Sequence, residues 1–348
     1  MNLDMSKLEP LLGTMVNELG AAANAALVFI GGKLGLFDAL AERPVTSAEL
    51  AAKTDTNERL VREWLASQAA SGYITYDGKT GKFSLSPEQA AVLADEDSTV
   101  FMRGGFLSLA AVFADEAKLA TAFRTGRGLG WGEHCNCLFC GVERFFRPGY
   151  KANLIDAWLP SLDGVVEKLQ RGAKVADVGC GHGASTILMA EAFPNSEFVG
   201  IDFHGASIEC AQQKAKHLKN ARFQAARAQD YTEDAFDLVA MFDALHDMGD
   251  PVGAARHARE TLKPDGTLML VEPMAGDTLE QNLNPVGRVF YAFSTAVCVP
   301  TSLNQEVGMA LGAQAGEKRL THVLREGGFS RFRRSAETPF NMVLEARP

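Results

Sequence analysis

The sequence predicts an α/β fold in which a doubly wound, mainly parallel sheet follows a mainly helical N-terminal region. Three observations lead to this prediction. In the second half of the 348-residue chain, short apolar runs alternate with helical patterns, as expected for strand–helix–strand units. A glycine-rich turn follows the first of these runs. The first third of the chain instead shows apolar residues at helical spacing, together with one hairpin signal.

The glycine-rich turn is the most informative local feature. An apolar run over residues 173–178 precedes it, and a helical pattern follows it. Gly179, Gly181 and Gly183 occupy alternate positions, and glycine is needed where the backbone approaches a ligand closely or takes positive φ. The spacing differs from the G-x-G-x-x-G of dinucleotide sites. Asp177, two residues before the first glycine, suits a ligand that carries a cation better than a pyrophosphate.

Further strands are expected downstream of this turn. Asp202 ends the second of them, where an acid in doubly wound sheets takes the ribose hydroxyls of a nucleotide. The carboxyl ends of the parallel strands are therefore the expected ligand site. The expected strands cover residues 196–202, 221–226, 236–242, 267–272, 330–336 and 341–346.

Four motifs in this order resemble those of class I S-adenosylmethionine-dependent methyltransferases. They are D-V-G-C-G-H-G at residues 177–183, Asp202, Gln229-Asp230, and L-K-P-D-G-T-L-M-L-V-E-P at residues 262–273. The resemblance implies a Rossmann-like seven-stranded domain whose last two strands form an antiparallel edge. It also implies S-adenosyl-L-methionine as the cofactor.

The resemblance assigns a role to each matching position. The loop from Asp177 to Gly183, which includes Gly179 and Gly181, would hold the methionine part of the cofactor. Asp177 would act on its amino group through water. The other contacts would be Asp202 on the ribose, Phe203 along the adenine, Gln229 or Asp230 at the adenine edge, and Phe242 beneath the sulfonium.

Composition narrows the classes of function. The net charge of −9 disfavours a nucleic acid as the general partner. The apolar run at residues 21–30 is too short for a membrane span, and the N-terminus lacks the charged segment of a signal peptide. Six cysteines without a secretion signal indicate reduced thiols. The sequence therefore predicts a cytoplasmic protein that binds neither nucleic acid nor membrane.

The first third of the chain predicts a winged helix. A capping box at residues 46–49 opens a short helix, residues 58–71 have helical spacing, and two short strands flank the turn at residues 77–81. This pattern permits a second hypothesis, a ligand-sensing regulator that binds DNA. Arg59 and Arg62 are, however, matched by adjacent glutamates, and DNA affinity depends on excess positive charge.

Winged-helix segments also precede the catalytic domain in the plant-type O-methyltransferases, which the chain resembles. The resemblance implies a homodimer, with the apolar helix predicted over residues 17–40 as a dimerisation element. We therefore expect a helical dimerisation domain at residues 1–125, a linker over the active site at 126–150 and a methyltransferase domain at 151–348. The alternative for residues 17–40 is an internal core helix.

The linker contains two groups of candidate residues. R-F-F-R-P-G-Y at residues 144–150 is similar to actinobacterial-type winged-helix methyltransferases of unassigned substrate, which makes Phe146 and Tyr150 candidate substrate-binding residues. The other group is His134 with Cys135, Cys137 and Cys140. These side chains can ligate a soft metal or a thiophilic acceptor. No second C-x-x-C is present, so the sequence favours no bound metal, and a metal-handling protein stays as a third hypothesis.

His246 is the candidate general base. It follows the fourth strand in the run H-D-M-G-D, which resembles the H-D-W-x-D run of plant-type O-methyltransferases except that Met248 replaces the tryptophan. A neutral imidazole near pH 7 suits proton removal from a hydroxyl. Glu272, at the end of the fifth strand, is the expected partner of the imidazole, and Glu317 is a weaker second candidate.

The acceptor is expected to be a small molecule. Residues 273–315 form a long insert after the fifth strand, and Phe290 and Tyr291 within it are candidate substrate-binding residues or helix packing. The leading prediction is methylation of a hydroxyl. A thiol, thioether or amine acceptor is the alternative, and a thioether needs no base.

Overall fold

The computed structural model describes residues 3–348 and divides into two compact units. One unit comprises the described residues up to 111 together with residues 140–148, and the other comprises residues 112–139 and 149–348. The predicted three-part division at residues 125 and 150 stays a prediction.

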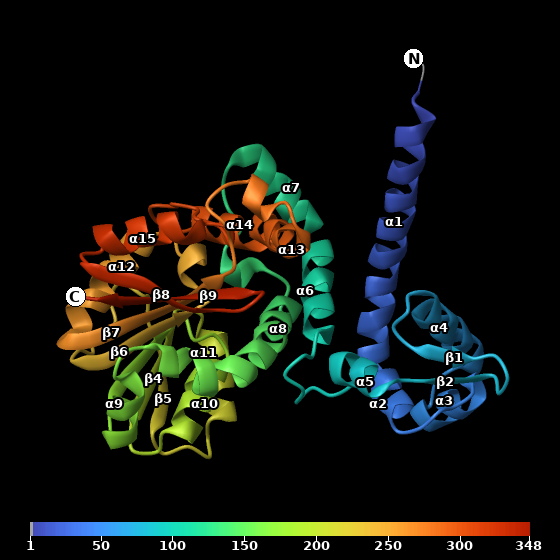
Figure 1. Ribbon diagram of the computed structural model, residues 1–348, viewed down its shortest axis with the longest axis horizontal. Coiled ribbons are helices and arrows are strands. Elements are labelled where there is room, and N and C mark those ends of the chain that lie inside the picture. Colours follow the sequence, from blue (N-terminus) through green and yellow to red (C-terminus); the bar gives the residue numbers. More distant parts are fainter. Residues whose placement is uncertain (1–2) are drawn as a thin grey trace. The chain divides into compact units, whose positions relative to one another are not determined.

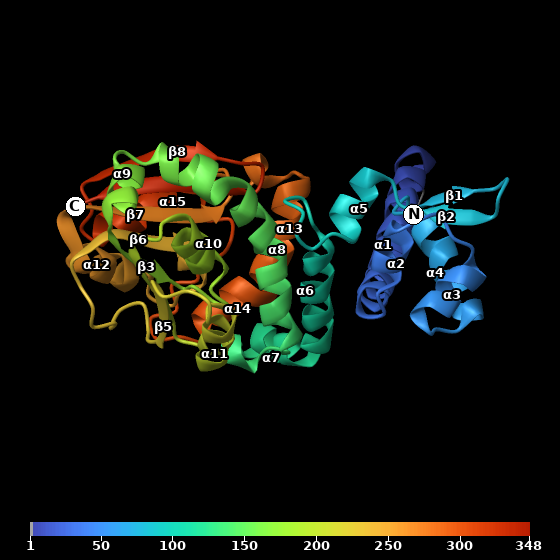
Figure 2. The ribbon, with the colours of Figure 1, turned by 90° about the horizontal axis from the view of Figure 1, so that it is seen from below.

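The first unit contains the winged helix. Helices α3 (Ser47–Thr54) and α4 (Glu58–Ala70) lie beside an antiparallel hairpin of β1 (Thr75–Asp77) and β2 (Lys82–Ser84) (Figure 2). The predicted capping box is present, because Thr46 accepts from the Glu49 N–H and Glu49 accepts from the Thr46 N–H. Val28, Phe37, Trp64 and Leu65 are among the residues that form its apolar core.

The helix predicted over residues 17–40 is two helices. α1 (Met5–Lys33) ends at Leu34, and α2 (Leu36–Ala41) begins after Gly35, which has a φ of 68°. Glycine adopts this left-handed conformation at little cost, so the chain turns there. By length and composition α1 is also long and apolar enough to cross a membrane, although buried helices of globular proteins and signal sequences pass the same test.

The second unit is built on a seven-stranded sheet with the order β5-β4-β3-β6-β7-β9-β8. The first five of these strands are parallel, and β9 pairs antiparallel with both β7 and β8. The strands are β3 (Lys174–Val178), β4 (Glu197–Asp202), β5 (Ala221–Ala225), β6 (Phe236–Phe242), β7 (Leu262–Pro273), β8 (Arg331–Glu337) and β9 (Asn341–Arg347). The predicted α/β class and antiparallel edge are confirmed. One difference is that β7 begins at Leu262, before the start of the strand expected at residues 267–272.

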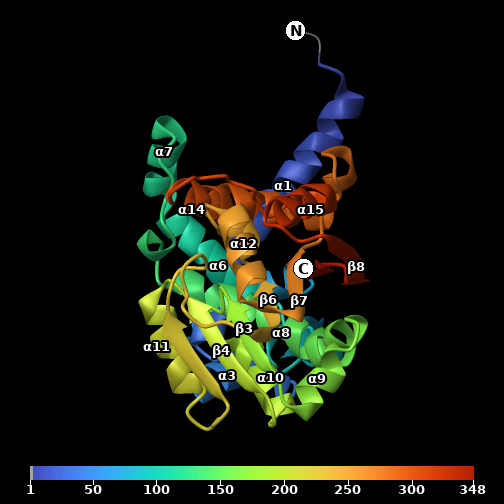
Figure 3. The same ribbon diagram turned by 90° about the vertical axis from the view of Figure 1, so that its left-hand side faces the viewer.

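Helices cover both faces of this sheet (Figures 1 and 3). α9 (Val165–Arg171), α10 (Ala184–Ala192) and α11 (Gly205–Lys214) cover one face, and α12 (Pro251–Thr261) and α15 (Gly316–Glu326) cover the other. The apolar strands β3, β4, β6 and β7 are nearly continuously buried, as parallel strands between two helical layers must be.

Further helices lie outside these layers. They are α5 (Pro87–Leu93), α6 (Arg103–Ala114), α7 (Glu116–Thr125), α8 (Cys137–Asn153), α13 (Pro285–Phe293) and α14 (Val299–Leu303). Of these, α5 and most of α6 belong to the first unit. Single turns occur at Trp131–Glu133, Leu245–Asp247 and Glu280–Asn282, and π-helical turns at Leu154–Trp158 and Ser294–Cys298.

Candidate active site

The loop after β3 has the backbone that its three glycines predict. Gly179, Gly181 and Gly183 all have positive φ, at 81°, 51° and 79°. A Cβ at Gly183 would lie 2.7 Å from the Phe223 ring, whereas a Cβ at Gly181 would meet nothing within 4 Å. Gly183 therefore serves helix–sheet packing, and the backbone at Gly181 faces open space where a ligand can approach.

Asp177 is buried beneath this loop and holds the start of α10. One carboxylate oxygen accepts from the Ser185 and Thr186 hydroxyls, each at 2.6 Å. The other oxygen, Oδ1, is buried without a hydrogen-bond partner. Burial raises the pKa of Asp177 to about 6, although the two hydroxyl donors oppose the shift. A buried carboxylate oxygen without a donor fits a cationic or hydrogen-bonding group of a ligand.

Asp202, at the end of β4, ties the same loop to the next strand. Its carboxylate accepts from the backbone N–H of Gly181 at 2.9 Å and of His204 at 2.8 Å. Burial raises its pKa, although both N–H donors act in the opposite direction. Phe203, the next residue, is 52% exposed, so this large ring is available to a flat partner.

An aromatic cluster that the sequence did not reveal includes His204, the residue after Phe203. The Phe139 ring lies tilted against His204, with centroids 4.6 Å apart, and against Trp131 at 5.3 Å. Gln229 donates to the backbone carbonyl of Asp250 at 3.2 Å. The exposed carboxylate of Asp230 accepts from the Arg227 N–H within a turn.

Tyr150 and Phe242, predicted for acceptor and cofactor respectively, are brought together. Their ring centroids are 5.4 Å apart, and the Tyr150 hydroxyl donates to Asp243 at 2.8 Å. The second Asp243 oxygen accepts from the Asn341 amide at 2.8 Å. Burial, followed by repulsion from Glu272, raises the pKa of Asp243 to about 8. Sequence reasoning missed Asp243, although an acid directly after a buried strand was a visible signal.

His246 and Glu272 form the predicted pair. Nδ1 of His246 lies 2.5 Å from one Glu272 oxygen, and the other oxygen accepts from the Leu245 N–H at 2.9 Å. Both side chains are buried. Burial alone would lower the pKa of His246, but Asp247 and Glu272 outweigh it and hold this pKa well above its usual value of 6.5.

Asp247 and Cys298 lie close to His246, and the sequence analysis assigned neither of them a role. His134, which the sequence analysis named only as a possible soft-metal ligand, also interacts with this group. Nε2 of His246 lies 3.1 Å from Asp247 Oδ1, and the Cys298 thiol lies beside both. His134 is buried nearby and interacts electrostatically with Asp247. Its Nδ1 is 3.0 Å from Asp115. His134 and Cys298 are far from His246 in the sequence, so no local motif relates them to it.

The structure places the remaining predicted residues elsewhere. Glu317 accepts from the Arg334 guanidinium and not from His246. Phe290 is buried on α13, which is the packing role that the sequence left open. Phe146 belongs to the other compact unit, where its ring meets Phe145 edge-on.

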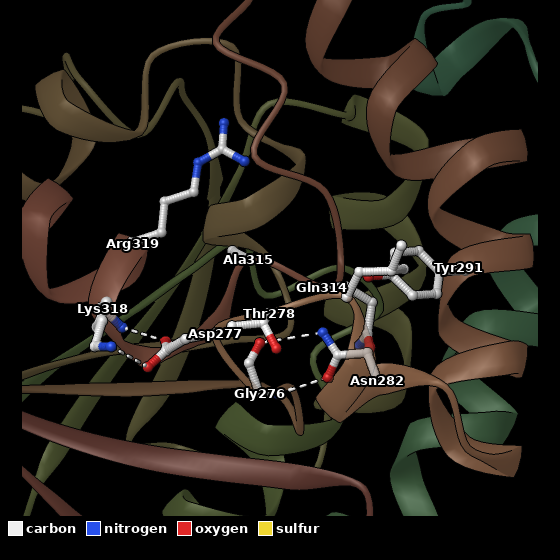
Figure 4. Close-up of a pocket in the computed structure, with 10 residues that line it drawn as sticks. Gly276, Asp277, Thr278, Asn282, Tyr291, Gln314, Ala315, Lys318 and Arg319 are labelled. Atoms are coloured by element: carbon white, nitrogen blue, oxygen red, sulfur yellow. Dashed lines mark hydrogen bonds and ion pairs between the residues drawn. The ribbon is translucent and has the colours of Figure 1, made fainter.

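Tyr291 lines a polar pocket of about 340 Å³ beyond the end of β7. Asp277 and Lys318 form an ion pair across it, and Asn282 bonds both backbone groups of Gly276 (Figure 4). Neither His246 nor Glu272 lines this pocket, so it is separate from the His246–Glu272 pair. Of the two predicted insert aromatics, Tyr291 lines this pocket and Phe290 does not.

The strand order, with β9 inserted antiparallel between β7 and β8, and the acid–glycine loop after β3 together define a class I methyltransferase fold. Comparison with known proteins agrees. Residues 169–328 match a family described as a methyltransferase domain, and residues 22–95 match an Rv2258c-like winged HTH domain. The predicted S-adenosylmethionine-dependent methyltransferase domain, preceded by a winged helix, is confirmed.

Curated relatives and solved structures extend this comparison. Demethylmenaquinone methyltransferase of Staphylococcus aureus is 27% identical over 135 residues, which are 38% of this chain and 54% of that protein. The chain thus spans about half the length of the curated relatives it matches.

Among solved structures, human N-acetylserotonin methyltransferase in complex with SAM has a TM-score of 0.73 at 18% identity, covering 100% of this chain and 99% of that one. Mitomycin 7-O-methyltransferase MmcR has a TM-score of 0.70 at 20% identity, covering 99% and 100%. At these identities the likeness concerns the fold.

Proposed function

We propose that the protein transfers the methyl group of S-adenosylmethionine to a hydroxyl of a small molecule, with His246 as the general base. The observation that carries this proposal is the buried His246–Glu272 pair at the carboxyl ends of two adjacent parallel strands. This is the end of an open α/β sheet where ligands bind. The same end carries the acid–glycine loop and Asp202.

The residues of the loop fit the cofactor. The unpartnered Asp177 oxygen is suited to the ammonium of the methionine part, directly or through water, and Gly181 leaves room for close approach. Asp202 is suited to the ribose hydroxyls, the exposed Phe203 ring to the adenine face, and Gln229 or Asp230 to its edge. When bound, the cofactor supplies a methyl group already activated on a sulfonium.

Three residues are suited to the region around this sulfonium. The rings of Phe242 and Tyr150 are in tilted contact, and the Tyr150 hydroxyl donates to Asp243. A carboxylate beside a sulfonium is stabilised in its charged form. We therefore assign Asp243 to the cation, in addition to the positions that the sequence predicted.

His246 removes the proton of the acceptor. The Glu272 carboxylate accepts from Nδ1–H, which leaves the Nε2 lone pair for the acceptor hydroxyl. The acceptor O–H bond would break and its proton would move to Nε2. The oxygen would bond to the methyl carbon that the bound cofactor supplies, while the bond from that carbon to sulfur breaks and leaves a neutral thioether. Because the pKa of His246 is raised, the imidazole must first lose a proton. Alignment of the two substrates contributes roughly 7–11 kcal/mol in such reactions.

Replacement of the base tests the proposal. Turnover of S-adenosylmethionine with a panel of small hydroxyl compounds identifies an acceptor, and His246→Ala is then measured with it. We expect a loss of at least about a hundredfold. His217→Ala is the matched control, because His217 is exposed and paired only with Glu191 on the surface. Unchanged turnover in His246→Ala would show that the base assignment is wrong.

The alternatives within this class concern the acceptor atom. A thioether has no proton to lose, so methylation of sulfur would leave His246 with a binding role only. A thiol or amine would still use the base. The DNA-binding alternative is less favoured, because Arg59 and Arg62 on α4 are held in ion pairs with Glu63 and Glu58.

The homodimer is also part of the proposal. The N-terminal half of α1 exposes an apolar stripe at helical spacing, comprising Leu11, Leu12, Met15, Val16 and Leu19. A second copy of α1 would bury such a stripe. Leu12→Glu combined with Val16→Glu is expected to convert a dimer to a monomer in light scattering. A wild-type monomer at micromolar concentration would rule the dimer out.

A further inference from the structure

His246, Asp247 and Cys298 bring three different metal-ligating atoms together inside the second unit. The imidazole nitrogen, the carboxylate oxygen and the thiol sulfur all lie within 4.8 Å of one another. Four ligands around a tetrahedral zinc ion are about 3.4–3.6 Å apart, as Zn–N, Zn–O and Zn–S bond lengths require. The three atoms would have to approach one another by at most about 1.4 Å to reach the spacing of a zinc site.

His134 lies outside this three-atom cluster and is the candidate for a fourth ligand. Its side chain is buried, its Nε2 has no hydrogen-bond partner, and its imidazole interacts with the Asp247 carboxylate. Asp247 Oδ1 also lacks a hydrogen-bond partner, because its 3.1 Å approach to His246 Nε2 is not aligned as a hydrogen bond. Two buried atoms without a hydrogen-bond partner, one in the cluster and one in a histidine that interacts electrostatically with it, require an explanation.

The two histidines are oriented in the same way. Glu272 holds Nδ1 of His246 at 2.5 Å, and Asp115 holds Nδ1 of His134 at 3.0 Å. Each carboxylate therefore fixes the tautomer in which Nε2 carries a lone pair. A carboxylate behind each ligating imidazole is the arrangement that orients histidines in zinc sites.

Charge also favours a cation here. The carboxylates of Asp115, Asp247 and Glu272 converge on the two imidazoles, and Lys118 reaches only the outer oxygen of Asp115. The ligand set is also positioned by the fold. Ser302 and Gln305, in and just after α14, bond the backbone of Met248 and Asp247, which fastens the segment after Cys298 to the His246 loop.

We propose that His134, His246, Asp247 and Cys298 bind a zinc-class divalent ion, and that this ion inhibits methyl transfer. Mixed imidazole, thiolate and carboxylate ligands favour zinc over magnesium or calcium. Zinc on Nε2 occupies the lone pair that proton removal needs, so its effect on turnover rests on the proposed function. Binding of the ion itself does not depend on the proposed function.

Cobalt(II), which absorbs where zinc does not, tests the binding directly. Metal-free full-length protein is titrated with cobalt and then with zinc. We expect one equivalent to bind, with a sulfur-to-cobalt charge-transfer band and the strong visible absorption of a tetrahedral site. Cys298→Ser should lose the charge-transfer band, and His134→Gln should weaken binding at least about tenfold.

Cys137→Ser is the matched control, because Cys135 and Cys137 place their sulfurs 2.7 Å apart in the neighbouring segment and offer a rival thiolate site. This variant should keep the band. No stoichiometric binding by wild type, or loss of the band in Cys137→Ser but not in Cys298→Ser, would overturn the proposal. If Cys298→Ser does not fold, His134→Gln carries the same test.

Turnover separates the two parts of the proposal. Zinc should suppress the turnover of the wild type. It should suppress the turnover of His134→Gln less, so the ratio of the activity without zinc to the activity with zinc should be smaller in this variant. Binding by cobalt together with turnover that zinc does not change would overturn the inhibitory role and leave the metal site standing. A protein that shows no methyl transfer at all would still give the cobalt result.

Discussion

The proposed donor-binding half of the site and the proposed acceptor half are built in different ways. The proposed donor half uses short segments at the ends of adjacent strands, and one Asp177 oxygen accepts from Ser185 and Thr186, which lie in the next helix. The acceptor half joins Asp115, His134, His246, Glu272 and Cys298, which come from five separate segments. Local contacts can be inferred from a motif, whereas a cluster assembled by packing cannot.

Removal of Asp202 should give the largest effect on the donor half. Its carboxylate is buried and accepts from the Gly181 N–H, so Asp202→Ala loses the proposed ribose contacts and loosens the loop. We expect S-adenosylmethionine to bind at least about a hundredfold more weakly, which corresponds to roughly 3 kcal/mol. Calorimetry measures this. Asp265→Ala, which removes an exposed partner of Lys168 near the start of β7, should bind normally.

Replacement of Glu272 tests the acceptor half. Glu272→Gln keeps the size of the side chain but removes one of the charges that raise the pKa of His246. We expect kcat to fall roughly 10–100-fold, the range for groups that orient a histidine. The pH profile of kcat should shift to lower pH, whereas a purely structural role of Glu272 would leave this profile unchanged. An unchanged pH profile would show that Glu272 does not influence the pKa of His246.

The fold was predictable because its signals are local and repeated. Asp177 to Gly183, Asp202 and the apolar strands mark the sheet, and the capping box at Thr46 marks a helix start. The break at Gly35 was missed because apolar spacing continues through it. Glu317 could not be placed from the sequence, since its choice of Arg334 depends on the strand β8 beside it. His134 and Cys298 carry no spacing signal that relates them to His246.

The pH dependence of activity and of stability should have opposite signs. His246 acts as a base only when neutral, so turnover should rise about tenfold per pH unit below its pKa, which lies above 6.5. A histidine whose pKa is higher in the folded than in the unfolded state stabilises the fold, and this contribution is complete at pH values below the pKa of the unfolded state. That contribution is lost as the pH rises through the folded pKa. Rate profiles and urea unfolding between pH 6 and 9, as a rough working range, measure both.

Asp243 should release a proton when the cofactor binds. Its pKa of about 8 means that it is mostly protonated at pH 7, and an adjacent sulfonium favours the charged form. Calorimetry in buffers of different ionisation enthalpy should show a net release of less than about one proton. Asp243→Asn should abolish this release. Equal release in the variant would assign the proton to another group, such as Asp177.

The two halves of the glycine loop offer the smallest and most local test. In Gly183→Ala the new Cβ would meet the Phe223 ring at 2.7 Å with a φ of 79°, so the free energy of unfolding should fall by about 2–4 kcal/mol. Gly181→Ala has open space and a φ of 51°, so the loss of unfolding free energy should be about 1 kcal/mol.

For cofactor binding, in contrast to stability, we expect the larger effect from Gly181→Ala and the smaller effect from Gly183→Ala. Gly181→Ala should weaken S-adenosylmethionine binding by more than its small loss of stability explains, because its methyl group projects into the space where the ligand approaches. Normal cofactor affinity in Gly181→Ala would mean that the ligand does not lie against this part of the loop.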